Sequence, residues 1–305
     1  MRYYVSTRMK RSLGVTDHRG RPLELADPPE RIVSLVPSDT YTLMRLGVGA
    51  RLVGRTRYCT EPAEELEGVP EVGGTKDADV EAILALRPQV VVANQEENTP
   101  KVVRALEAAG VPVLLSFPKR VGEGLAQVGR LARLLGPLAP EARELVAWAY
   151  RKHAEAEARR ATRQPVRSFV AIWRDPWMTV HAETFVSDVL DLVGAKNVFA
   201  ERVRRYPLSA DVGDGAPLPA AGLEGRDVRY PRISLEELVA HAPELVLLPD
   251  EPYAFGPAEV EELAALDLPA AKAGRIVCCS GRPLMWHGLY AIEKLDELAA
   301  IVAGA

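Results

Sequence analysis

The sequence predicts an α/β protein of two lobes, each built on a parallel sheet, joined by one long helix. Three observations predict this fold class. Short apolar runs alternate with helical segments, which is the rhythm of parallel sheets. A chain of 305 residues that is 48% hydrophobic usually exceeds a single core. One short motif of helix, proline and apolar strand occurs twice, on either side of a strongly charged helical stretch.

The first lobe alternates strand and helix after a polar hairpin turn at 16–22. An apolar run ends at Pro37, and Ser38 or Asp39 then offers a side chain suited to cap a helix. Later helices end before Pro88 and at Gly110. The expected elements are strands at 31–36, 52–56, 90–93 and 111–115, with helices at 40–46, 79–86 and 99–109.

The middle of the chain differs in kind, because apolar residues recur at helical spacing from Gly122 and the charge rises toward Arg160. We interpret this stretch as a rigid spine in which Trp148 packs in the core. The second lobe is expected to contain strands at 168–172, 245–248 and 275–279, helices at 184–193, 234–241 and 290–302, and a loop at 211–227. The predicted domains are 1–121, the linking helices 122–163, and 164–305.

The repeated motif covers 80–88 and 235–243, and each copy precedes an apolar strand. Glu81 and Glu236 hold the same place relative to their prolines. Short helices that precede buried strands are common in α/β proteins, so coincidence remains an alternative. The position of the copies on either side of the long helix favours two similar lobes.

Composition excludes several classes of protein. The net charge is -4, and no basic stripe with interleaved aromatic residues suggests nucleic acid. No stretch reaches the roughly 18 apolar residues of a membrane span, so we expect a protein that is not inserted in a membrane. The three cysteines, Cys59, Cys278 and Cys279, lack zinc-ligand spacing, and their odd number argues against a disulfide framework. We expect free buried thiols and no metal bound by the chain itself.

The first residues carry positive charge, but no apolar segment of a secretory signal follows them. The sequence as written therefore predicts a cytoplasmic protein. The alternative is a periplasmic or cell-surface protein whose true start lies upstream.

Several segments together resemble class III periplasmic binding proteins, the helical-backbone receptors for cobalamin, ferric siderophores and haem. The resemblance covers nearly everything from about Val15, and no single motif is decisive. It is carried, in order along the chain, by 31–38, 47–54, 69–74, 81–93, 188–199 and 248–255. It implies two Rossmann-like lobes joined by a single long backbone helix, with the ligand held between them. It also implies a monomer without a tightly bound cofactor that works with an ABC importer.

By this resemblance, an acidic side chain on each lobe docks on the membrane permease, and here these would be Glu81 and Glu236. The alternative is that both are exposed carboxylates near helix N-termini, where the helix dipole favours negative charge.

The ligand wall is assigned to aromatic residues at loop positions, where broad rings can stack on a flat macrocycle. Ordinary packing is the alternative for each residue alone. The candidates are Tyr58, Trp173, Trp177 and Trp286, with His287 beside the last. By resemblance, Pro37, Ser38, Gly74 and Thr75 lie at the tips of the first lobe and offer polar groups to the ligand.

Asn94, Glu96 and Glu97 follow an apolar strand, and ligands of open α/β sheets bind outside the carboxyl ends of strands. Tyr58, His181 or His287 can coordinate haem iron or the metal of a chelate. For His181 a structural imidazole is the alternative.

The sequence therefore predicts a substrate-binding protein that captures a corrinoid, a ferric siderophore or haem. One alternative is a cytoplasmic sensor or carrier of such chelates without a permease. Another is an α/β enzyme, which is disfavoured because neither a glycine-rich nucleotide loop nor a nucleophile elbow is present.

Overall fold

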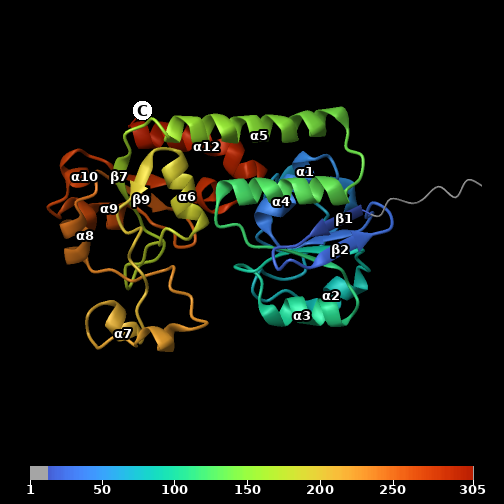
Figure 1. Ribbon diagram of the computed structural model, residues 1–305, viewed down its shortest axis with the longest axis horizontal. Coiled ribbons are helices and arrows are strands. Elements are labelled where there is room, and N and C mark those ends of the chain that lie inside the picture. Colours follow the sequence, from blue (N-terminus) through green and yellow to red (C-terminus); the bar gives the residue numbers. More distant parts are fainter. Residues whose placement is uncertain (1–12, 305) are drawn as a thin grey trace, which may run out of the picture. The chain divides into compact units, whose positions relative to one another are not determined.

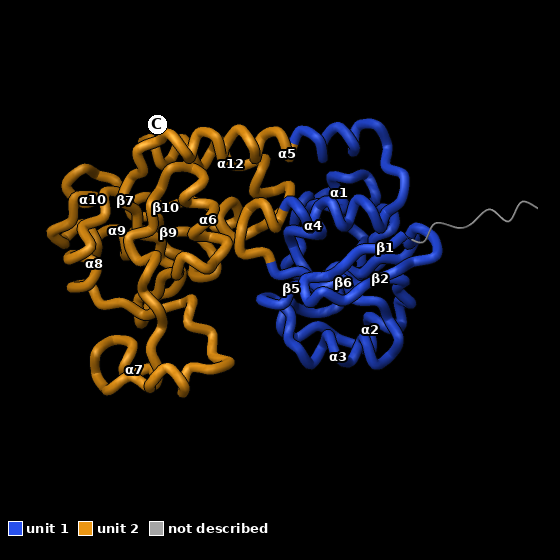
Figure 2. The backbone as a smooth tube through the Cα atoms, viewed as in Figure 1, with its two compact units in different colours: residues 1–117, 125–148 blue, residues 118–124, 149–305 orange. Residues whose placement is uncertain are grey.

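The computed structural model describes residues 13–304, which divide into two compact units (Figure 2). Unit 1 comprises Met1–Phe117 and Leu125–Trp148, and unit 2 comprises Pro118–Gly124 and Ala149–Ala305. The division passes through two helices, α4 (Val121–Leu134) and α5 (Pro140–Arg160). The domain borders expected at 121 and 163 stay a prediction. Within the described residues, no helix combines the length and apolarity needed to cross a bilayer.

Unit 1 is built on a four-stranded parallel sheet (Figure 1). Its order is β4-β3-β5-β6, so β3, the first strand of this sheet in the chain, lies between β4 and β5. The elements are the hairpin β1 (Leu13–Thr16) and β2 (Pro22–Leu25), then β3 (Ile32–Ser34), α1 (Pro37–Arg45), β4 (Leu52–Arg55), α2 (Val80–Ala85), β5 (Val90–Asn94), α3 (Pro100–Ala108) and β6 (Val113–Ser116).

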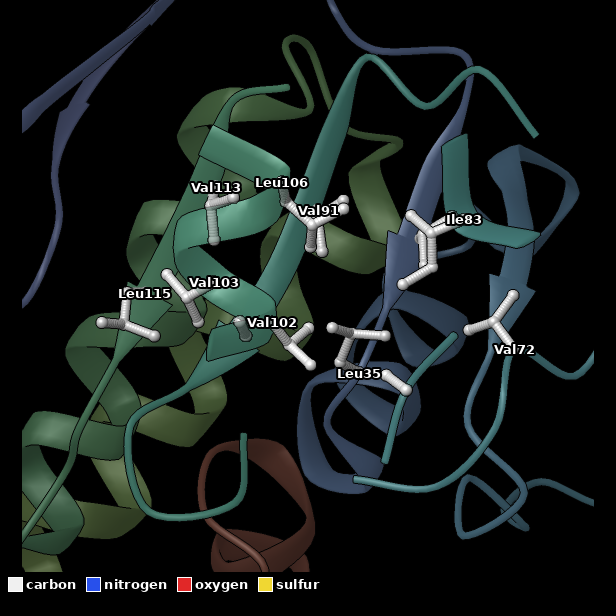
Figure 3. Close-up of a cluster of buried hydrophobic side chains, with 12 residues drawn as sticks. Leu35, Val72, Ile83, Val91, Val102, Val103, Leu106, Val113 and Leu115 are labelled. Atoms are coloured by element: carbon white, nitrogen blue, oxygen red, sulfur yellow. The ribbon is translucent and has the colours of Figure 1, made fainter. Parts of the chain in front are cut away.

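The core of unit 1 forms where α2 and α3 pack on this sheet (Figure 3). Every residue of β5 is buried, as expected for a parallel strand covered on both faces. Close packing of aliphatic side chains from the strands and the two helices holds the layer together. The labelled side chains are Leu35, Val72, Ile83, Val91, Val102, Val103, Leu106, Val113 and Leu115.

The start of α1 corrects one expectation. The helix begins at Pro37, and its N-cap is Val36, which makes no side-chain cap. A proline ring fixes φ near the helical value and needs no hydrogen-bond acceptor in the first turn. Ser38 and Asp39 therefore lie inside the first turn, buried, instead of preceding it.

Unit 2 has a second four-stranded parallel sheet with the order β10-β9-β7-β8. Relative to the prediction, β8 is an additional strand, and the expected loop at 211–227 contains a 3-10 turn, Ala220–Leu223. The elements are β7 (Val166–Val170), α6 (Phe185–Leu192), β8 (Ala195–Asn197), α7 (Leu208–Asp211), α8 (Leu235–His241), β9 (Leu245–Pro249), α9 (Pro257–Ala264), α10 (Pro269–Lys272), β10 (Ile276–Cys279), α11 (Arg282–Met285) and α12 (Leu289–Ala303).

The repeated motif is a structural repeat. Helices α2 and α8 are capped by the side chains of Asp79 and Ser234, which accept from backbone N–H groups three residues later. Both connections reach their proline through a residue with positive φ, Arg87 at 48° and Ala242 at 46°. Each then enters a strand buried at every position, β5 or β9.

The cysteines correct a further expectation. Cys59 is buried, but Cys278 is exposed and Cys279 is half-buried. Both belong to β10, the edge strand of its sheet, in which no residue is fully buried.

Candidate functional site

In unit 1, Tyr58 lies just beyond the carboxyl end of β4 and is 52% exposed. The guanidinium of Arg57 lies 5.2 Å from the centre of its ring. Arg57 Nη2 also donates to both carboxylate oxygens of Asp77, at 3.1 and 3.0 Å, and this bond lowers the pKa of Asp77. The phenol is therefore presented to solvent beside a guanidinium whose charge is already paired.

Gly74 lies directly against this ion pair. A Cβ at Gly74 would lie 2.2 Å from Asp77 Oδ1 and 2.7 Å from Arg57 Nη2, so a larger residue would displace the pair. Gly74 is itself buried, and its neighbour Thr75 is half-buried. The structure therefore gives Gly74 a part in packing beneath the pair.

Asn98 was missed from the sequence, and it connects the loops of unit 1. Its Nδ2 donates to the carbonyls of Leu35 (3.1 Å) and Thr75 (2.9 Å), and its Oδ1 accepts from the Asn94 N–H (2.8 Å). It is buried, so these bonds lie away from competing water. Its position four residues after Asn94 was the available signal, since both amides follow one strand.

Asn94 has a similar internal role. Its Oδ1 accepts from the N–H groups of Glu96 (2.7 Å) and Glu97 (3.3 Å), and its Nδ2 donates to Ser116 Oγ (3.3 Å). Glu96 is half-buried, and its carbonyl accepts from Lys76 Nζ. The buried amide of Asn94 thus shapes the loop that carries the two glutamates.

In unit 2, four rings form an aromatic ladder composed of Trp173, Tyr253, Phe255 and Trp177. Trp173 meets Tyr253 edge-on at 5.6 Å, and Tyr253 lies 4.7 Å from Phe255 between ring centres. Phe255 stacks on Trp177 at 5.6 Å with 5° between the ring planes. Tyr253 and Phe255 were not singled out from the sequence, although they close a segment that carries the resemblance.

The ladder runs from the interior of unit 2 to its surface. Trp177 is 6% exposed, and its indole N–H has no hydrogen-bond partner among the described residues. Trp173 at the other end is 45% exposed. Arg174 lies 5.1 Å from the Trp177 ring and pairs with Glu262 at 2.5 Å, which fixes the turn. Trp173 follows β7 and Tyr253 follows β9, so the exposed end lies where parallel strands present ligand-binding residues.

Trp286 and His287 lie inside unit 2. The Trp286 ring packs at 4.9 Å from Tyr290, with Arg282 5.3 Å from its centre. His287 is 4% exposed, and Phe185 packs edge-on against it. Burial lowers the pKa of His287 to about 4, so the ring is neutral at pH 7. These two residues support the unit from within.

His181 organises a turn, since its Nδ1 accepts from the Glu183 N–H at 3.0 Å. Across the part of the chain that the structure describes, no three His, Cys, Asp or Glu side chains are grouped to hold a metal ion.

Glu81 and Glu236 are exposed, and each is the second residue of its helix, α2 or α8. A hydrogen bond from Ser234 lowers the pKa of Glu236. The two carboxylates therefore occupy equivalent places on the two units. Pro37 and Ser38, in contrast, are buried in α1.

Curated relatives include the vitamin B12-binding proteins of Yersinia pestis (strain Pestoides F) and Yersinia pseudotuberculosis (serotype O:1b). Each is 30% identical to this chain over 183 residues, which are 60% of this chain. The matched region spans 64% of the length of these relatives, less than two thirds.

Solved structures share the fold. The periplasmic vitamin B12-binding protein BtuF of Vibrio cholerae has a TM-score of 0.70 and 21% identity, covering 90% of this chain and 97% of its own. The periplasmic haem-binding protein RhuT of Roseiflexus sp. has a TM-score of 0.70 and 22% identity, covering 90% and 98%. Helicobacter pylori CeuE with bound Ni(II) has a TM-score of 0.72 and 16% identity, covering 95% and 89%. The expected two-lobed α/β fold with parallel sheets is confirmed.

The expected cytoplasmic location is wrong, because the family model that matches this chain is that of periplasmic binding proteins. The absence of an apolar segment near Met1 was not a sound basis for that expectation. A family model described as "Periplasmic binding protein" matches residues 32–283, which is most of the chain. This chain therefore belongs to the periplasmic binding protein family.

Proposed function

We propose that this chain is the substrate-binding component of an ABC importer and that it captures a metal chelate with flat conjugated or aromatic parts: a corrinoid, haem or a ferric siderophore. The aromatic ladder of unit 2, exposed at Trp173, is the observation that carries this proposal. Similarity to vitamin B12-binding and haem-binding proteins supports it. The metal is cargo that enters with its chelator.

The ladder suits such a ligand for physical reasons. A rigid ring buries a large apolar area at little cost in conformational entropy, and aromatic faces stack on conjugated macrocycles. Trp173 is held by Tyr253, so its ring is preorganised before the ligand arrives. Tyr58 offers a second exposed ring from unit 1.

We propose that the protein binds its ligand without catalysis. We also propose that it is a monomer that does not bind nucleic acid and is not inserted in a membrane. The neutral, buried His287 is poorly placed to exchange a proton with a ligand. Chemical turnover of a bound chelate that is lost in a His287→Ala variant would favour the alternative of an enzyme.

Calorimetric titration with cyanocobalamin, haem and a ferric catecholate siderophore tests the proposal. We expect one of them to bind and Trp173→Ala to weaken that binding by about 10-fold, with a smaller loss in Trp173→Phe. Tyr150→Ala is the matched control, because Tyr150 in α5 is 46% exposed but lies outside the ladder. The proposal fails if none of the three chelates binds, or if Trp173→Ala and Tyr150→Ala behave alike.

We also propose that Glu81 and Glu236 dock on the permease of this importer. Their equivalent, exposed places at the starts of α2 and α8 support this role, since a two-fold permease would present the same surface twice.

A further inference from the structure

The connection from β8 to α8, residues 198–234, is anchored to the backbone that follows Trp173. The N–H groups of Thr179 and His181 donate to the carbonyls of Pro231 (3.0 Å) and Arg229 (2.8 Å). Arg204 N–H donates in turn to the carbonyl of Val228 at 2.8 Å. The part that contains α7 stands off from the sheet of unit 2 (Figure 1). The connection is therefore hydrogen-bonded to the backbone just after Trp177, the buried end of the aromatic ladder.

Two carboxylates within this connection are already used. Asp211 is fully buried and accepts from the backbone N–H groups of Arg205 (2.8 Å) and Arg232 (2.7 Å) and from Arg202 Nη1 (3.3 Å). Asp227 accepts from Arg229 Nε (2.9 Å) and Nη2 (2.6 Å). Neither carboxylate accepts a hydrogen bond from Arg204 or Arg226, the two arginines that pack on Tyr206.

Those two arginines, Arg204 and Arg226, pack on the Tyr206 ring with their guanidinium carbons 5.4 and 4.8 Å from its centre. The ring is fixed, since its hydroxyl donates to the Asp227 carbonyl at 2.8 Å. Arg204 Nε is buried and has no hydrogen-bond partner among the described residues, and the nearest carboxylate oxygen, on Asp211, is 4.0 Å away. Arg226 uses its Nε for the Gly222 carbonyl at 3.1 Å and forms no ion pair with a described residue.

Two like charges on one ring repel each other, and an anion between or beside them would remove that repulsion. A guanidinium presents parallel N–H donors that match the oxygens of a carboxylate or a phosphate. We propose that Arg204 and Arg226, arranged around Tyr206, form an anion-binding site in unit 2 that takes a carboxylate or phosphate group of the transported chelate. This inference rests on the proposed function, and it adds a charge requirement to stacking.

The test compares chelates with and without an anionic group, and haem and its dimethyl ester are the pair that differs in that group alone. Haem carries two carboxylates, whereas its dimethyl ester carries none; cobalamin carries a phosphodiester, whereas cobinamide lacks it. In the double variant Arg204→Gln/Arg226→Gln we expect affinity for the anionic member of one pair to fall about 10-fold or more. Affinity for its neutral counterpart should change less than about twofold. The pair that responds identifies the source of the anion.

Arg205→Gln is the matched control, because Arg205 is exposed in the same connection, it is not one of the two arginines packed on the Tyr206 ring, and the change removes one positive charge. We expect this control to leave the affinities unchanged. The double variant Arg204→Lys/Arg226→Lys keeps both positive charges, so it should retain part of the affinity for the anionic chelate that the glutamine double variant loses. Thermal unfolding of each variant confirms a folded protein.

Equal losses for the anionic and neutral members of each pair, or unchanged affinity in the double variant, would overturn the inference while the proposed function stands. A wild-type protein that binds neither haem nor cobalamin, nor their analogues, would overturn both.

Discussion

Units 1 and 2 use the same scaffold and differ in the connection between the second strand of the sheet and the capped helix before the third strand, which is α2 in unit 1 and α8 in unit 2. In both sheets the strand that comes second in the chain lies at one edge, followed by the first, the third and the fourth: β4-β3-β5-β6 in unit 1 and β8-β7-β9-β10 in unit 2. In unit 1 this connection carries Arg57 on Tyr58, and Asp77 neutralises the arginine. In unit 2 it carries Arg204 and Arg226 on Tyr206; among the described residues no carboxylate hydrogen-bonds either guanidinium, and Arg204 Nε lies 4.0 Å from Asp211 Oδ2. The repeat thus conserves topology, and the long connections provide the chemical difference.

A second difference lies near the start of the helix that follows the first strand of each four-stranded sheet, where Ser-Asp occurs in both α1 and α6. Asp39 is buried in α1, accepts from Gln127 Nε2 at 3.4 Å and faces the charge of Arg130 on α4. Asp188 in α6 accepts from the Val121 N–H at 2.8 Å and pairs with Arg120 (3.4 Å) and Arg160 (3.7 Å). Burial therefore dominates the pKa of Asp39, whereas Asp188 is held by a backbone N–H and two arginine side chains.

The largest expected effect separates these two aspartates. Burial raises the pKa of Asp39 from 3.8 to about 7, so the folded chain holds a proton there that the unfolded chain has released. Stability from this group is present at low pH and is lost as pH rises from about 4 to about 7. Asp39→Asn should therefore be nearly neutral at pH 4 and stabilise by roughly 2 kcal/mol or more at pH 8. Asp188→Asn should destabilise by roughly 2 kcal/mol at pH 7, because it breaks the contacts with Arg120 and Arg160.

Urea unfolding of both variants between pH 4 and pH 8 measures these changes. Amide exchange in peptides from β5 and β9 assigns them to unit 1 or unit 2. If Asp39→Asn destabilises at pH 8 as much as Asp188→Asn does at pH 7, the two sites are equivalent and the comparison is wrong.

Much of this architecture could be predicted from the sequence, because strand and helix patterns are local. Apolar runs such as 90–93 and 245–248 and the capping residue Ser234 mark their elements directly. The three-residue strand β8 was missed, since so short a strand is defined by its pairing with β7 more than by its own residues.

The candidate site was harder to predict, because it depends on which side chains meet. Trp173 was expected at the surface and Trp177 beside it, but a buried end at Trp177 follows from packing on Phe255. The bonds of Asn98 join loops that are distant in the sequence. The meeting of Arg204 and Arg226 requires the connection to fold back on itself, and no local pattern encodes that.

The next effect tests whether the two units act together at a permease. The double variant Glu81→Gln/Glu236→Gln should reduce ligand uptake through the reconstituted importer by about 10-fold while leaving ligand binding unchanged. Each single variant should show an intermediate loss, because either unit would retain one docking carboxylate. Glu261→Gln is the control, since Glu261 is an exposed carboxylate that belongs to α9 and to neither of the two repeated helices. Uptake that is equal in the double variant and in Glu261→Gln would contradict docking through these residues.

The smallest effect concerns a backbone conformation that occurs once in each unit, just before the proline of the repeated motif. Arg87 and Ala242 each adopt positive φ before a proline, a conformation that costs an L-residue with a Cβ about 1–2 kcal/mol. Glycine avoids this cost but gains freedom in the unfolded chain, so Arg87→Gly and Ala242→Gly should each stabilise by only about 0.5 kcal/mol. The controls are Ala85→Gly and Ala240→Gly, at exposed right-handed positions of α2 and α8, which should each destabilise by about 1 kcal/mol. Urea unfolding measures all four changes. Opposite signs for Arg87→Gly and Ala242→Gly would show that the two connections are not energetically equivalent, whereas matching gains would extend the repeat from topology to backbone energetics.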